Sequence, residues 1–272
     1  MALSGIGVAG CGRMGAPMLA ALRNAGFDAA GYDVKPYDSY GPLAPFMLTD
    51  QAFSKRLEVL ISVVRDIPQT EDLLFGAQSF VQAPHLRTII LSSTLSPRYV
   101  RDLRDRIPAH ITLIDAPMSG AAISAQDARL SFMLGGTDQD LDAHQPLFDA
   151  MGEHFHRMGG FGMGMQAKVL NNLLAASHTA MTRLVLDWAD QAGIDEQKLL
   201  NLIDTSSGQN WLASGFDTIE FARDGWQADN TIGILTKDVA SALDAAPELA
   251  DTSLPELIQA NIRALKLRHQ KC

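Results

Sequence analysis

The sequence predicts an α/β fold with a doubly wound parallel sheet in its N-terminal part. Two observations support this prediction. The first 35 residues have the pattern strand, tight turn, helix, strand. Short apolar runs then alternate with helical or loop stretches as far as residue 115, which is typical of parallel sheets covered by helices.

The first unit begins with GIGVAG at residues 5–10, a run of small and β-branched residues that predicts a strand. A helical pattern starts at Gly15, and a second strand is expected at residues 27–34. Gly10, Gly12 and Gly15 form GxGxxG at the turn. In a dinucleotide-binding unit these glycines allow the tight turn, the close approach of a pyrophosphate and the packing of helix on strand.

Asp33 ends the second strand, about twenty residues beyond the glycines, as the dinucleotide fingerprint requires. Its carboxylate would accept hydrogen bonds from ribose hydroxyls and repel a 2′-phosphate, which favours NAD over NADP. Lys35 weakens that preference. The alternative is that the glycines only punctuate a βαβ unit and Asp33 is a turn residue.

The later elements are expected as strands at residues 57–64, 86–92 and 111–115, and as helices or loops at 67–75 and 97–107. The region between Asp33 and Leu57 is short and has three prolines in PYDSYGPLAP, which predicts that one helix of the nucleotide domain is truncated or irregular.

Ligands of doubly wound sheets bind at the carboxyl ends of the strands. The candidates there are Val64 with Arg65, the Ser92-Ser93-Thr94 segment, and residues 116–120, which include Ser119 and Gly120. Caps and turns alone could also explain serine, threonine and glycine at these places.

A long helix is expected from about residue 165 to 192. At 100° per residue, this helix has two different sides. The polar or small side has Lys168, Asn171, Asn172, Ala175, Thr179 and Thr182. The apolar side has Leu170, Leu174, Met181, Val185 and Trp188. We expect the apolar side to pack. Lys168 is the only charge between Gln166 and Thr182, so the polar side is predicted to be semi-buried, although a solvated face is the alternative.

Composition excludes several classes of partner. The net charge of -9 and the lack of a Lys/Arg-dense run argue against nucleic acid. Charges interrupt the apolar stretches before the roughly 18 residues that a membrane helix needs. The N-terminus suggests no signal peptide, no metal site is predicted, and two cysteines, Cys11 and Cys272, give no disulfide framework, so a cytoplasmic location is expected.

Four ordered segments carry a family resemblance: GVAGCGRMGAPM at 7–18, DAPMSGAAISAQDARLSFMLGG at 115–136, GMGMQAKVLNN at 162–172 and, more weakly, TKDVASALDAA at 236–246. They resemble the β-hydroxyacid dehydrogenase family, which includes 3-hydroxyisobutyrate dehydrogenase and tartronate semialdehyde reductase and has 6-phosphogluconate dehydrogenase as a larger relative. The resemblance implies a Rossmann-like NAD(P)-binding domain at 1–160 and an all-α substrate and dimerisation domain at 161–272.

The implied activity is NAD(P)-dependent interconversion of a short β-hydroxyacid and its semialdehyde or keto acid, in a homodimer or homotetramer. Lys168 would be the general acid/base, and Asn172 would orient the lysine and bind the substrate, while Ser119 and Gly120 would hold the substrate carboxylate. The implied cofactor-binding residues are Gly10, Cys11, Gly12, Arg13, Met14, Gly15, Asp33, Val64, Arg65, Thr94 and Lys237. Without the resemblance, Lys237 and Asp238 would be a surface charge pair.

Several positions depart from the family pattern. Arg65 stands at a usual proline, and Ala121 and Ser124 stand at usual glycines. Leu184-Val185 replaces a glutamate–alanine pair, and Asn230 lies near a missing aromatic residue. We expect these changes to affect the substrate more than the reaction class.

Two alternatives stay open. One is an imine reductase on the same scaffold, which Lys168 disfavours because those relatives usually carry another residue there. The other is a non-catalytic dinucleotide-binding protein.

Overall fold

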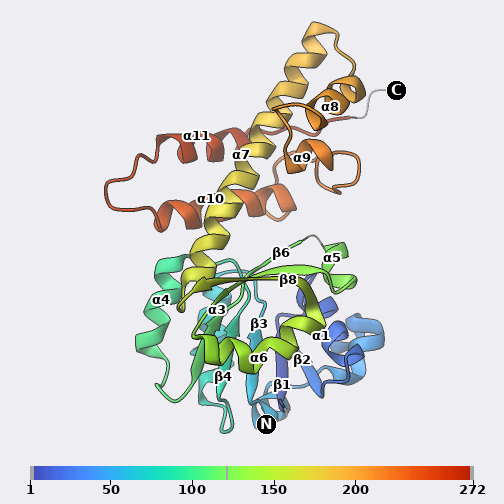
Figure 1. Ribbon diagram of the computed structural model, residues 1–272. Helices are drawn as coiled ribbons and strands as arrows, with labels where there is room; N and C mark the ends of the chain where they lie inside the picture. Colours follow the sequence, from blue (N-terminus) through green and yellow to red (C-terminus); the bar gives the residue numbers. More distant parts are fainter. Residues whose placement is uncertain (1–2, 121, 270–272) are drawn as a thin grey trace. The chain divides into compact units, whose positions relative to one another are not determined.

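A computed structural model describes residues 3–120 and 122–269, so Ala121 and Cys272 lie outside the described residues. The chain divides into two compact units, with the boundary after Lys168, inside the long helix α7 (Met163–Ala192) (Figure 1). The domain boundary proposed from the sequence, at residue 160, stays a prediction.

The first unit is built on a sheet that has eight strands within the described residues, in the order β2-β1-β3-β4-β5-β7-β6, with β8 paired to β7. The strands are β1 (Ile6–Ala9), β2 (Ala29–Tyr32), β3 (Val59–Ser62), β4 (Thr88–Leu91), β5 (Thr112–Asp115), β6 (Met118–Ser119), β7 (Leu130–Gly135) and β8 (Gly152–Gly159). Strands β1 to β5 are parallel. The predicted α/β class is thereby confirmed, while β6, β7 and β8 were not predicted.

Strand β1 lies between β2 and β3, so the chain crosses from one side of β1 to the other after β2. This reversal is the switch point at which doubly wound sheets bind ligands. Strands β1 to β4 are buried along their whole length, because helices cover both faces of a parallel sheet. Strands β1 to β4 are one or two residues shorter than predicted at each end, and β5 begins one residue later than predicted but ends at Asp115 as expected.

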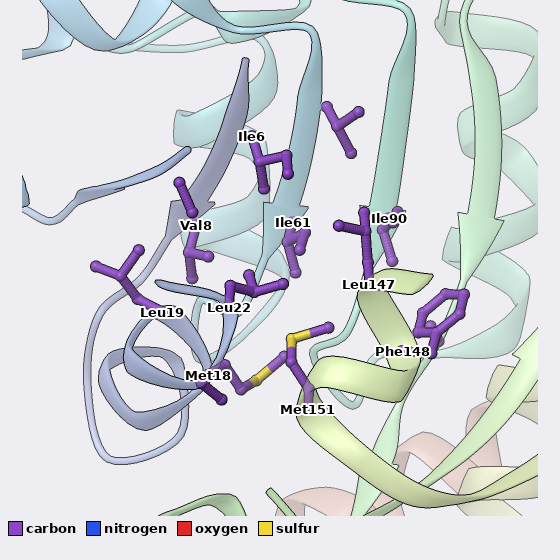
Figure 2. Close-up of a cluster of buried hydrophobic side chains, with 14 of the residues drawn as sticks. Ile6, Val8, Met18, Leu19, Leu22, Ile61, Ile90, Leu147, Phe148 and Met151 are labelled. Carbon is purple, nitrogen blue, oxygen red and sulfur yellow. The ribbon is translucent and has the colours of Figure 1, made fainter. Parts of the chain in front are cut away.

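The helices and 3₁₀ turns of this unit before α7 are α1 (Gly15–Asn24), η1 (Tyr37–Phe46), α2 (Asp50–Arg56), α3 (Ile67–Leu74), η2 (Phe80–Gln82), α4 (Pro97–Arg106), α5 (Ala122–Gln126) and α6 (Asp138–Met151). Figure 2 shows side chains of α1 and α6, among them Leu22 and Phe148, packed on one face of the sheet. A second core on Leu60 and Ile89 includes Leu73 of α3 and Leu103 of α4. The sheet therefore lies between two helical layers.

Element η1 replaces a regular helix, as PYDSYGPLAP predicts. Gly41 interrupts it with φ 52° and ψ -120°, and Pro42 and Pro45 lie within it. Proline lacks the N–H that a continuing helix needs.

The second unit begins at Val169 and continues along α7 to α8 (Glu196–Asp204), α9 (Trp211–Ser214), α10 (Thr231–Asp244) and α11 (Ser253–Arg263). One core gathers around Leu186, Leu200 and Phe216, and another around Ile232 and Val239. No helix in the described part of the chain is long and apolar enough to cross a bilayer.

One prediction about α7 was wrong. Its apolar side does not pack within this chain, since Leu170, Leu174, Met181 and Trp188 are 54%, 62%, 60% and 65% exposed. The polar side is the buried one, with Lys168, Asn172, Thr179 and Thr182 all buried. Angular periodicity separates two faces of a helix, but it does not show which of them the same chain covers.

Candidate active site

The glycine turn after β1 is closely packed at two of its three glycines and open at the other. Gly10 has φ +89°, and a β-carbon there would lie 2.7 Å from the backbone nitrogen of Val64. A β-carbon at Gly15 would lie 2.2 Å from the carbonyl oxygen of Gly10, whereas one at Gly12 would meet nothing within 4 Å. The first and third glycines therefore allow close packing, and the second leaves open space beside exposed backbone.

Cys11 lies in this turn with its side chain in the core. Burial, and secondarily the charge of Asp33, raises the pKa of the Cys11 thiol to about 12. The thiol donates to the carbonyl oxygen of Val8 at 3.4 Å. Of the predicted loop residues, Cys11 can therefore offer a ligand only its backbone, while Arg13 is exposed and Met14 half-buried.

Asp33 follows β2 directly, and its Oδ1 accepts a hydrogen bond from the amide of Lys35 at 3.1 Å. The hydroxyl of Tyr40, in η1, lies near it. Burial first, and then the charge of Asp33, raises the pKa of Tyr40 above its ordinary value. Tyr40 therefore keeps its proton, and it is a neighbour of Asp33 that the sequence did not indicate.

The segments after β3 and β4 also lie at the carboxyl ends of the parallel strands. Val64 is half-buried, while Arg65 is exposed and its amide donates to Oε1 of Gln69 at 3.0 Å. Thr94 is half-buried, and the amide of the next residue, Leu95, donates to Sδ of Met165 at 3.3 Å. The Thr94 segment therefore lies against the first turn of α7.

Asp115, the last residue of β5, is fully buried and bound to the same helical turn. Its Oδ1 accepts from the amide of Gly162 at 2.6 Å, and its Oδ2 accepts from the amide of Met165 at 2.5 Å. Burial raises the pKa of Asp115 to about 6, against the opposing effect of these amides. Lys168, one turn after Met165, is 7% exposed.

The predicted carboxylate site follows Asp115. Ser119 is half-buried in β6, where it pairs with Ser131 of β7. Gly120 is exposed with φ +130°, and a β-carbon there would lie 2.8 Å from Cβ of Ser124. Ser124, one of the departures from the family pattern, therefore stands directly beside Gly120.

In the second unit, Asn172 is held by a residue that sequence reasoning assigned only to a surface pair. Nδ2 of Asn172 donates to Oδ2 of Asp238 at 2.6 Å. Asp238 is buried on α10, and its Oδ1 lies 3.6 Å from Nζ of the half-exposed Lys237. The burial of Asp238 could have been found from its place between Leu235 and Ala242, three residues before it and four after it on one side of α10. Asn171 is exposed.

A doubly wound sheet with a glycine turn at its switch point and an acid after the second strand defines a dinucleotide-binding protein. Residues 5–160 match the NAD binding domain of 6-phosphogluconate dehydrogenase. Residues 162–268 match the NAD-binding domain of NADP-dependent 3-hydroxyisobutyrate dehydrogenase. The chain belongs to the β-hydroxyacid dehydrogenase family, and NAD(P) is its cofactor class.

Curated proteins with similar sequences are dehydrogenases and reductases of hydroxyacids. The probable mitochondrial 3-hydroxyisobutyrate dehydrogenase of Dictyostelium discoideum is 26% identical over 74% of this chain and 65% of that protein. The 2-hydroxy-3-oxopropionate reductase of Escherichia coli is 30% identical over 70% of this chain and 66% of that one. The chain thus spans about two thirds of the length of these curated relatives.

Solved structures share the fold. The Mycobacterium tuberculosis 3-hydroxyisobutyrate dehydrogenase described with L-serine has a TM-score of 0.77 and 24% identity, covering 96% of this chain and 95% of that one. The 3-hydroxyisobutyrate dehydrogenase of Salmonella typhimurium has a TM-score of 0.80 and 21% identity, covering 97% and 96%.

Proposed function

We propose that this protein is an NAD(P)-dependent dehydrogenase that interconverts a short β-hydroxyacid with its semialdehyde or keto acid. The observation that carries the proposal is Lys168, whose buried side chain lies one turn into a helix whose start is bonded to the segment after β4 and to the end of β5. A buried lysine in a chain with a dinucleotide-binding domain suits proton transfer to or from a substrate hydroxyl.

Each residue then has a part in the reaction. The bound nicotinamide supplies hydride transfer. Nζ of Lys168 takes the hydroxyl proton during oxidation and returns it during reduction. Ser119 and the Gly120 amide hold the substrate carboxylate, and Asn172, fixed by Asp238, orients the reacting group.

The remaining predicted residues bind the cofactor. The Gly10–Gly15 turn takes the pyrophosphate and Asp33 the ribose, so we propose NAD as the preferred dinucleotide. Val64, Arg65, Thr94 and Lys237 complete the cofactor-binding set. The fit of the glycine turn supports this, since Gly12 leaves the space that a phosphate would fill.

The test is to titrate NADH and NADPH by fluorescence and to assay the wild type and Lys168→Ala with 3-hydroxyisobutyrate, L-threonate and 2-hydroxy-3-oxopropionate. We expect Lys168→Ala to lower kcat by about 10² to 10⁴, and Lys198→Ala, an exposed lysine of α8, to leave it unchanged. Full turnover by Lys168→Ala would refute the mechanism. Tighter binding of NADPH than NADH would refute the role of Asp33.

The same screen separates the alternatives. Reduction of a cyclic imine without hydroxyacid turnover would favour an imine reductase. Dinucleotide binding without any turnover would favour a non-catalytic protein.

We also propose that the chain forms a homodimer through the exposed apolar side of α7. Leu170, Leu174, Met181, Leu184 and Trp188 are exposed there. Their separations of four, seven, three and four residues fit a helix–helix seam, in which positions recur at alternating steps of four and three, with Ser177 at the one position of the seam that is not apolar. An apolar stripe of this kind marks an interaction surface, and a seam that faces its own copy is the simplest symmetric arrangement. The cytoplasmic location stays a prediction from cysteine usage.

A further inference from the structure

We propose that Asp115 is a positioning residue for Lys168, and that its carboxylate fixes the first turn of α7 relative to the strand end that leads to Ser119. The inference rests on the proposed function of Lys168. All of the residues concerned belong to the first compact unit.

The two carboxylate oxygens bind two different amides at the start of α7. Oδ1 accepts from Gly162 and Oδ2 from Met165, at 2.6 and 2.5 Å. Amides at the start of a helix have no partner within the helix, and the helix dipole favours a negative charge there. Because the two amides are three residues apart, the two hydrogen bonds together fix the position of the first turn along the axis of α7 and its rotation about that axis.

The carboxylate has little room to take another position. A β-carbon at Gly135, which pairs with Asp115, would lie 2.1 Å from Oδ1 of Asp115. A β-carbon at Gly164 would lie 2.3 Å from the carbonyl oxygen of Met133. Glycines at both positions let β5, β7 and α7 approach closely enough to enclose the carboxylate completely.

This contact differs from two other carboxylate caps among the described residues. Asp66 and Asp195 cap α3 and α8 from the position just before each helix. Asp115 lies 47 residues before Gly162 and 50 before Met165, so it joins separate parts of the fold. It is also four residues before Ser119, at the end of the strand that leads to the proposed carboxylate site.

The consequence for Lys168 follows from helix geometry. Lys168 is three residues beyond Met165, about 4.5 Å along the helix axis, so a rotation of the first turn moves Nζ directly. A displacement of about 1 Å between reacting groups can cost about 10²-fold in rate. Asp115 would thus act on catalysis without touching the substrate.

The experiment compares Asp115→Asn with the matched cap variant Asp195→Asn, each with a hydroxyacid that the wild type turns over. An asparagine keeps one acceptor oxygen and has an NH₂ donor in place of the other, so it can accept a hydrogen bond from only one of the two amides in this arrangement. We expect Asp115→Asn to lower kcat by about 10- to 100-fold, with the Kd for NADH within about twofold and faster hydrogen exchange at the amides of residues 162–168. Asp195→Asn should change neither kcat nor that exchange.

The inference is refuted if Asp115→Asn keeps the wild-type kcat, or if the exchange at 162–168 is unaltered. Equal losses of kcat in the two variants would also refute it, because they would reflect stability alone. If Asp115→Asn does not fold, Asp115→Ser keeps one acceptor and must show the same pattern. Failure of the proposed function is a separate result, namely full turnover by Lys168→Ala.

Discussion

The buried carboxylate of Asp115 should give the protein an unusual dependence of stability on pH. Burial raises the pKa of Asp115 from its ordinary 3.8 to about 6, so the native state binds this proton more tightly than the unfolded chain does. The resulting stabilisation is fully present below pH 3.8 and is lost as the pH rises through about 6. Relative to a side chain that cannot ionise, the free energy of unfolding should increase by about 2 kcal/mol between about pH 7.5 and about pH 4.5.

Urea denaturation of the wild type and Asp115→Asn across that range measures the effect. Subtracting the two free energies of unfolding cancels the contributions of the other carboxylates, which are the same in both proteins. Carboxylates whose pKa is lowered by partners destabilise the protein as the pH falls, which is opposite to the effect of Asp115. The difference, wild type minus variant, should rise towards acid. A flat difference, or one that falls towards acid, would show that the two amides outweigh burial and that the pKa of Asp115 is not raised.

Three further predictions test other parts of the structure. Gly10→Ala should weaken NADH binding by at least about tenfold, whereas Gly26→Ala, which has φ +90° but open space around it, should bind normally; equal effects would implicate backbone strain alone. Met181→Glu should convert the proposed dimer to a monomer in light scattering with little change in helicity, and a dimer that persists would place the interface elsewhere. In a Cys272→Ser background the buried Cys11 thiol, with its pKa raised to about 12, should react with maleimide only after unfolding, and rapid labelling of the native protein would contradict its burial.

The sequence predicted the nucleotide-binding half best because several kinds of evidence coincide there. Strand β1, the glycine turn and α1 agree in periodicity, turn chemistry and spacing, and each constrains the next. Two of the strands beyond Asp115 were missed for a physical reason. Strand β6 has only two residues, and β8, GEHFHRMG, is mostly exposed and polar, so neither gives a bounded apolar run. Strand β7, LSFMLG, is such a run, and it lay unassigned within the segment that carries the family resemblance.

The candidate site could be predicted residue by residue, but its supporting contacts could not. Lys168, Asn172 and Ser119 stand in motifs, whereas the partners of the helix start depend on contacts over long sequence separations. Asp115 reaches Gly162 across 47 residues, and Asp238 reaches Asn172 across 66. A carboxylate at the end of an apolar strand shows no sign in the sequence of whether it will face solvent or two helix amides.

The reversed faces of α7 follow from where its polar groups find partners. Asn172 bonds to Asp238, and Thr182 donates to Oδ1 of Asn210 at 3.2 Å. Arg183, also buried, donates to the carbonyl oxygens of Ala222 and Asp224 at 2.9 and 2.7 Å. Buried polar groups are tolerated only when they are bonded in this way, so the second unit covers the polar side of the helix. Leucine, methionine and tryptophan are then left on the outside, where a second copy of the chain can cover them.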